Sequence, residues 1–183
     1  MKNRTELAKY FSEQGFKVGA EIGVAQGYYS RTLCQQNPNL KLYCIDYWGP
    51  YPGYSDFFRD ETVPGRMYEE AKKNLEGLNC EIIRKLSVDA SKDFKDESLD
   101  FVFIDGGHDY KNVNADIRAW TPKVRKGGVV SGHDYYVTKT GNTGVIKAVD
   151  DYVKEFGYEL KLTDWDRGNP SKDDRQPCWY FTK

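Results

Sequence analysis

Residues 18–27 constrain the fold of this chain more than any other segment. They read Val-Gly-Ala-Glu-Ile-Gly-Val-Ala-Gln-Gly and lead from an apolar, strand-like segment through a glycine-rich turn to a helix predicted to begin at Tyr28. Because Gly23 and Gly27 carry no side chain, a ligand can approach the backbone of this turn closely. The free N–H groups at the start of the helix would then point toward that ligand.

The spacing of the glycines indicates which ligand this turn can accept. Glycines stand at positions 19, 23 and 27, so the G-x-G-x-x-G pattern that receives the pyrophosphate of a dinucleotide is absent. The carboxylate of Glu21 would repel a pyrophosphate but suits a ligand with a positively charged amino group. S-adenosylmethionine has such a group and no phosphate. An ordinary strand–turn–helix corner, in which the glycines serve packing, is the alternative.

Composition and charge argue against several classes of protein. The chain has 183 residues, enough for one domain with a core, and its net charge of −1 predicts no strong electrostatic binding to nucleic acid or to an anionic membrane. No apolar run approaches the roughly 20 residues that span a bilayer. The charged N-terminus does not resemble a signal peptide, and the scattered cysteines form no C-x-x-C motif, so we expect a cytoplasmic protein.

Strand-like and helical segments alternate along the chain, which is typical of an α/β protein with helices on both faces of a parallel sheet. We expect strands at 17–22, 42–47, 81–86, 99–105 and 129–131, and helices at 5–14, 28–36, 67–75, 110–120 and 145–156. No helix separates the last two predicted strands, at 158–162 and 178–182, so they should pair antiparallel. No boundary interrupts the pattern, and residues 1–183 are interpreted as one domain.

Acidic side chains and both histidines stand where predicted strands end, which is the ligand-binding edge of an open α/β sheet. Asp46, at the end of the second strand, can accept hydrogen bonds from two ribose hydroxyls; a plain surface aspartate is the alternative. Neighbouring strands would bring Asp105, His133 and Asp134 together, and such groups can hold Mg²⁺ or Mn²⁺. Equally, they could bond loop backbone and cap helices, as Asp109 would do at an N-cap.

The segment from 47 to 66 is long for a connection and rich in aromatic residues. Six aromatic side chains fall close together here: Tyr47, Trp48, Tyr51, Tyr54, Phe57 and Phe58. Placed over the strand ends, the segment could form a lid that stacks on the cofactor and covers an acceptor, with Trp48 as the best single candidate for the cofactor. A flap that seals the core, or a homodimer contact, is the alternative.

Four motifs in order, E-I-G-V-A-Q-G, C-I-D-Y-W, F-V-F-I-D-G-G-H-D-Y and G-G-V-V-S-G-H-D-Y, resemble those of class I S-adenosylmethionine-dependent methyltransferases. More narrowly, the chain is similar to a small group with I-D-G-x-H and G-G-H-D-Y signatures, related to sugar and catechol-type O-methyltransferases. The resemblance implies a Rossmann-like sheet of seven mostly parallel strands that ends in an antiparallel hairpin. It also implies S-adenosylmethionine as cofactor and a small-molecule hydroxyl as acceptor.

The resemblance further implies roles for individual residues. The residues expected to contact the cofactor are Glu21, Gly23, Gly27, Ser30, Asp46, Trp48, Ser87 and Asp105. The metal-dependent relatives place ligands at the positions of Asp105, His133 and Asp134, although His133 replaces the usual carboxylate. With Asp105, His108 is the candidate catalytic residue, since its reference pKa near 6.5 suits a base at neutral pH.

Two other functions stay open from the sequence. One is a nicotinamide-dependent oxidoreductase on a similar sheet, against which the missing G-x-G-x-x-G pattern argues. The other is a non-catalytic module that binds the cofactor only.

Overall fold

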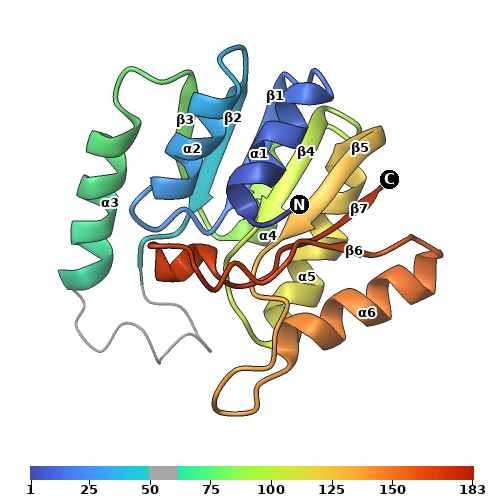
Figure 1. The fold of residues 1–183 in the computed structure, drawn as a ribbon. Helices are drawn as coiled ribbons and strands as arrows, with labels where there is room; N and C mark the ends of the chain where they lie inside the picture. Colours follow the sequence, from blue (N-terminus) through green and yellow to red (C-terminus); the bar gives the residue numbers. More distant parts are fainter. Residues whose placement is uncertain (50–61) are drawn as a thin grey trace.

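A sheet of seven strands, in the order β3-β2-β1-β4-β5-β7-β6, forms the centre of the described part of the chain (Figure 1). The computed structural model describes residues 1–49 and 62–183. The strands are β1 (Val18–Ile22), β2 (Lys41–Asp46), β3 (Cys80–Arg84), β4 (Leu99–Ile104), β5 (Val124–Gly132), β6 (Lys161–Leu162) and β7 (Trp179–Thr182). Strands β1 to β5 pair in parallel, whereas β7 runs antiparallel to both β5 and β6. The predicted sheet and its antiparallel C-terminal pair are confirmed.

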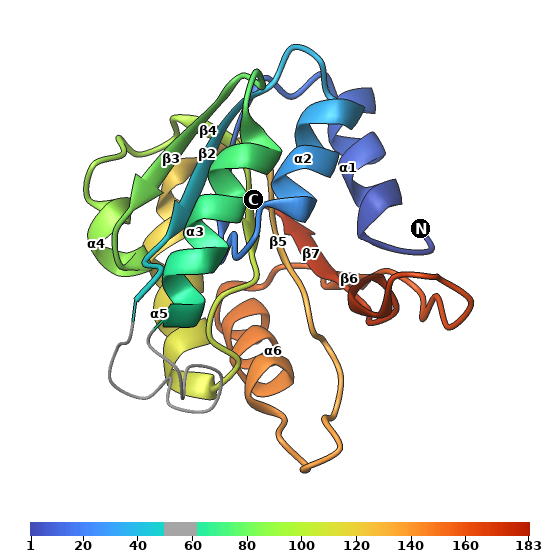
Figure 2. The same ribbon diagram turned by 90° about the vertical axis from the view of Figure 1, so that its left-hand side faces the viewer.

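Helices cover both faces of this sheet (Figures 1 and 2). The first face carries α1 (Arg4–Glu13), α2 (Tyr28–Gln36) and α3 (Thr62–Leu75), and the second carries α4 (Ser87–Ser91), α5 (Tyr110–Trp120) and α6 (Gly144–Phe156). The unbroken apolar run of β4 explains the two cores. Phe101 and Phe103 pack beneath α1 and α2, while Val102 and Ile104 pack beneath α5 and α6, because successive strand residues face opposite sides.

Several element bounds differ from the predictions. Helix α4 is not predicted, because five residues are too few to show a helical period. Helix α3 begins at Thr62 instead of 67, since Pro64 lies in the first turn, where its missing N–H costs no helical hydrogen bond. Strand β5 begins at Val124 and includes Gly128, where a Cβ atom would lie 2.4 Å from the Asp100 carbonyl oxygen.

Most of the predicted aromatic lid lies outside the described residues. Tyr51, Tyr54, Phe57 and Phe58 fall within 50–61, so the lid and the homodimer contact stay predictions. Among the described helices, none combines the length and the apolar character needed to cross a membrane.

Candidate functional site

The topology of the sheet brings the ends of β1, β2 and β4 together. From β1 the chain runs outward to β2 and β3, and it then crosses back to β4 on the other side of β1. This reversal of strand order opens a crevice at the carboxyl ends of β1 and β4. Gly23, Asp46 and Asp105 follow or end these three strands. Two backbone hydrogen bonds join the strand ends: Gly23 N–H donates to the Ile45 carbonyl at 2.9 Å, and Asp105 N–H donates to the Ile22 carbonyl at 2.7 Å.

The glycine turn after β1 depends on a close backbone contact at Gly23. Gly23 has a φ of +87°, and a Cβ atom there would lie 2.1 Å from the Asp105 carbonyl oxygen, which leaves no room for a side chain. Gly27, with a φ of +81°, is the N-cap of α2. Gly27 lies against Leu75 of α3 and lines neither of the two cavities described below.

Asp46 fixes the loop that faces it. Its two carboxylate oxygens accept hydrogen bonds from the backbone N–H groups of Ala25, at 2.9 Å, and Trp48, at 3.0 Å. The indole N–H of Trp48 donates to the Ala25 carbonyl at 2.8 Å, and its buried ring packs 5.0 Å from the ring of Tyr68. Trp48 therefore lies beneath the turn and lines neither cavity, whereas Asp46 lines both.

Glu21 is a buried carboxyl group at the end of β1. Its side chain is 1% exposed, accepts a hydrogen bond from the Ser30 hydroxyl of α2, and lines the larger cavity. Burial raises the pKa of Glu21 to about 8, although the Ser30 hydrogen bond opposes this shift. Ser30 is fully buried and lines neither cavity, so it lies behind Glu21.

Two cavities adjoin at this edge of the sheet. The larger, of about 600 Å³, extends from Glu21 to the ends of β4 and β5. The smaller, of about 290 Å³, lies between the end of β2 and helices α4 and α5, and Ser87 lines it. Gly23, Asp46 and Gly106 line both cavities. A ligand can therefore occupy both at once, with its middle part beside Asp46.

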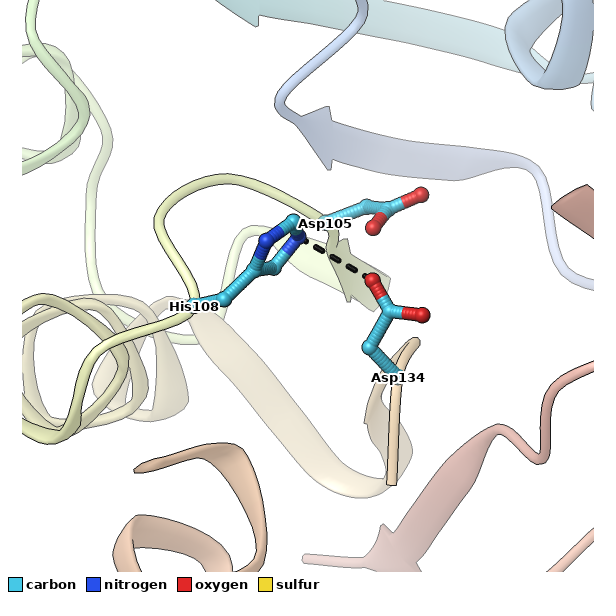
Figure 3. Close-up of side chains that lie close together, drawn as sticks. All are labelled: Asp105, His108 and Asp134. Carbon is cyan, nitrogen blue, oxygen red and sulfur yellow. Dashed lines mark ion pairs between the residues drawn. The ribbon is translucent and has the colours of Figure 1, made fainter. Parts of the chain in front are cut away.

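Four titratable side chains gather where β4 and β5 end. Figure 3 shows His108 and Asp134 facing each other beside Asp105, with His108 Nε2 3.0 Å from Asp134 Oδ2. His133 approaches the same carboxylate from the other side, with Nδ1 3.2 Å from Asp134 Oδ1 and 3.7 Å from Asp105 Oδ1. Asp134 thus lies between the two imidazoles. The predicted meeting of Asp105, His133 and Asp134 is present.

The charges in this cluster shift one another's pKa values. Hydrogen bonding to Asp134 raises the pKa of His108, and the nearby carboxylates of Asp105 and Asp109 add to the effect. Burial tends to lower the pKa of His133, but the charges of Asp105 and Asp134 outweigh it and raise that pKa. The two imidazoles hold the pKa of Asp134 below its usual range against the effect of burial, whereas burial raises the pKa of Asp105.

The metal-ligand set that fits best differs from the predicted one by a single residue. Among the described residues, Asp105, His108 and Asp134 each offer a ligand atom, and these atoms lie within 4.8 Å of one another. Two carboxylates and an imidazole are suitable ligands for Mg²⁺ or Mn²⁺. Within the same part of the chain, His133 Nε2 is buried without a hydrogen-bond partner.

Two residues of this site escaped the sequence analysis. Arg4 of α1 lies 3.5 Å from Asp105 and also contacts Asp174, and no local signal identifies it because only the tertiary fold carries α1 over the strand ends. Asp116 of α5 is buried against the smaller cavity. The sequence could have indicated this burial, because Asp116 falls on the same helical stripe as the apolar residues Val113 and Trp120.

Solved structures share this fold at low sequence identity. An O-methyltransferase from Bacillus cereus, solved with S-adenosylhomocysteine, matches 98% of this chain and 80% of its own with a TM-score of 0.68 and 18% identity. The O-methyltransferase NovP gives a TM-score of 0.69 at 18% identity over 98% of this chain and 79% of its own. A precorrin-8w decarboxylase from Methanobacterium thermoautotrophicum gives 0.63 at 15% identity over 100% and 96%. These matches establish the fold and not the reaction.

Sequence comparison establishes the family. An uncharacterized protein from Sinorhizobium fredii is 38% identical over 60 residues, which are 33% of this chain but only 7% of that relative's length. A family model described as a methyltransferase domain matches residues 20–135, from β1 to the loop after β5. That match includes Glu21, Asp46, Asp105, His108 and Asp134, and it covers more than half of the chain. The chain therefore belongs to the methyltransferase-domain family.

Proposed function

We propose that this protein transfers the methyl group of S-adenosylmethionine to a hydroxyl oxygen of a small molecule. The observation that carries the proposal is the pair of adjoining cavities, which meet at Gly23 and Asp46 and end beside the cluster of Asp105, His108 and Asp134. Membership of the methyltransferase-domain family and the fold of O-methyltransferases support it. The turn after β1 lacks the pattern of a pyrophosphate site, which disfavours a nicotinamide cofactor.

The cofactor would extend across both cavities. In this arrangement Asp46 accepts hydrogen bonds from the ribose hydroxyls with the lone pairs that the loop backbone leaves free. Glu21 accepts a hydrogen bond from the amino group of the methionine part, and Ser87 lies beside the adenine ring. Ser30, Gly27 and Trp48 act indirectly, because they hold Glu21 or shape the turn without lining either cavity.

His108 would act as the general base. In the neutral form of this residue, Nε2–H donates to Asp134 and leaves the lone pair of Nδ1 free. The acceptor hydroxyl then gives its proton to Nδ1 while its oxygen attacks the methyl carbon, for which the sulfonium of S-adenosylmethionine is the leaving group. Asp134 orients the imidazole and stabilises the imidazolium that forms.

As an alternative to His108 acting as the base, the site suits a divalent cation. Asp105, His108 and Asp134 would hold Mg²⁺ or Mn²⁺, which would lower the pKa of a bound hydroxyl. The remaining contribution of the chain is orientation and exclusion of water at the larger cavity.

Calorimetric titration tests the cofactor assignment. We expect S-adenosylhomocysteine to saturate the wild-type protein and NAD to give no saturation. Asp46→Asn should weaken the binding of S-adenosylhomocysteine by about tenfold or more, since it replaces a charged acceptor of hydroxyl hydrogen bonds. Asp96→Asn, at an exposed aspartate paired with Lys123, is the control and should bind normally. Saturation with NAD and none with S-adenosylhomocysteine would refute the proposal.

The reaction itself is tested with S-adenosylmethionine labelled in its methyl group. A panel of neutral sugars and catechols, assayed with and without Mg²⁺ or Mn²⁺, should reveal acceptors that gain the label. A non-catalytic module would be favoured by two results together. The protein would bind the cofactor but transfer no methyl group to any hydroxyl in the panel, and His108→Ala would leave the biological activity unchanged.

A further inference from the structure

The smaller cavity contains a buried carboxyl group that the proposed mechanism does not use. Asp116 lies on α5 among Val113, Ile117 and Trp120, all of which are buried, and is itself 6% exposed. Helical spacing therefore turns Asp116 toward the sheet instead of solvent. Its carboxylate lines the cavity near Gly106, where a Cβ atom would lie 3.6 Å from Asp116 Oδ2.

Asp116 lacks a compensating positive charge. Among the described residues no ion pair involves it, and the charge of Asp109 nearby has the same sign. The Ser87 hydroxyl is the polar neighbour that opposes the rise of its pKa, and the Ser87 oxygen accepts a hydrogen bond from the indole N–H of Trp120 at 2.9 Å. Burial raises the pKa of Asp116 to about 6. A buried carboxylate with one neutral donor costs free energy, so a ligand that supplies further N–H groups would offset that cost.

The walls of the cavity fit a flat heterocycle that carries such N–H groups. Apolar side chains make up much of its lining: Ile22, Ile45, Leu86, Val88 and Ala115. At one end of the cavity, Asp46 faces the position of the ribose in the proposed cofactor arrangement. An adenine ring attached to that ribose would lie between the apolar walls and could present its exocyclic amino group to Asp116.

We infer that Asp116 recognises the exocyclic amino group of the adenine ring and selects S-adenosyl compounds over analogues with a carbonyl oxygen in its place. The inference rests on the proposed function, since it takes the cofactor to occupy both cavities. An amino group donates to the carboxylate, whereas a carbonyl oxygen at the same position repels it. The Ser87–Trp120 pair orients the carboxylate, so Ser87 has a positioning role.

The test compares two ligands by calorimetry: S-adenosylhomocysteine and S-inosylhomocysteine, its deaminated analogue. Wild-type protein should bind the adenosyl compound at least about tenfold more tightly. In Asp116→Asn, which keeps the size of the side chain, the ratio of the two dissociation constants should fall toward one. A merely structural role would weaken both ligands equally and leave the ratio unchanged, which would overturn the inference.

Asp89→Asn is the matched control. Asp89 lines the same cavity but is exposed and paired with Lys92 at 2.6 Å, so its replacement should leave the ratio intact. A changed ratio in Asp89→Asn but not in Asp116→Asn would assign the recognition to Asp89 and contradict the inference. Equal affinities of the wild-type protein for the two compounds would also contradict the inference. If the wild-type protein binds neither compound, the proposed function itself fails.

Discussion

The two halves of the candidate site are held in place by different forces. The corner after β1 and β2 is built from backbone: Gly23 and Ala25 adopt positive φ, and Asp46 binds two backbone N–H groups. The cluster after β4 and β5 is instead built from titratable side chains that pair with one another around Asp134. The first half should therefore respond to changes of shape, and the second to changes of charge and pH.

Gly23→Ala should have the largest effect, because it disrupts the backbone corner. The new Cβ atom would lie 2.1 Å from a carbonyl oxygen at a φ of +87°, so we expect a loss of about 3 kcal/mol or more in the free energy of unfolding, with cofactor binding abolished. Denaturant unfolding measures the first effect and calorimetry the second.

Gly77→Ala is the control, since Gly77 has a φ of +76° but a Cβ atom there would meet no atom within 4 Å. This control should cost only about 1 to 2 kcal/mol. Equal losses in the two variants would show that the contact at Gly23 is unimportant.

His108→Ala should disrupt the charged half and leave the corner intact. We expect affinity for S-adenosylhomocysteine close to that of the wild type and a rate of methyl transfer lower by about 10² to 10⁴. Because Asp134 raises the pKa of His108, the wild-type rate should rise with pH through a value above 6.5, and the variant should lose that dependence. Initial rates across pH, measured with an acceptor from the labelling panel, test both expectations. Wild-type turnover by the variant would exclude His108 as the base.

Glu21→Gln should change mainly how the stability of the protein depends on pH, and it tests a buried titratable group of the backbone corner. Burial raises the folded-state pKa of Glu21 to about 8, so between that value and its ordinary pKa of 4.5 the native state binds the extra proton. The stability contributed by this group is therefore present at low pH and is lost as pH rises toward 8, with a slope of up to about 1.4 kcal/mol per pH unit. Urea unfolding at several pH values should show a flatter profile in the variant. An unchanged slope would mean that Glu21 ionises normally.

Patterns of apolar residues predicted the fold well, for a physical reason. A run such as Phe101–Ile104 must be buried on both faces, which predicts a central parallel strand. Ligands bind beyond the carboxyl ends of such strands, and Asp46, Asp105 and Asp134 all lie at that edge. These inferences depend on periodicity and topology, which sequence carries directly.

Side-chain direction within the loops could not be predicted in the same way. Trp48 has a φ of +44°, and its ring lies under the glycine turn and lines neither cavity. His108 reaches Asp134 Oδ2 because of the path of the chain through Gly106 and Gly107. These glycines have no side chains, so no polar–apolar pattern in the sequence predicts that path. Arg4 reaches the site only because α1 docks over β4.

The contacts of Arg4 have a consequence for how the site forms. Its guanidinium joins Asp105 and Asp174, which are 101 and 170 positions away along the chain. Bringing residues so far apart in sequence together lowers the conformational entropy of the chain before their contacts stabilise it. Such pairings are therefore expected to form late in folding. We therefore expect the charged half of the candidate site to be completed only after the first helix and the C-terminal segment have both docked, so that partly folded chains would lack it.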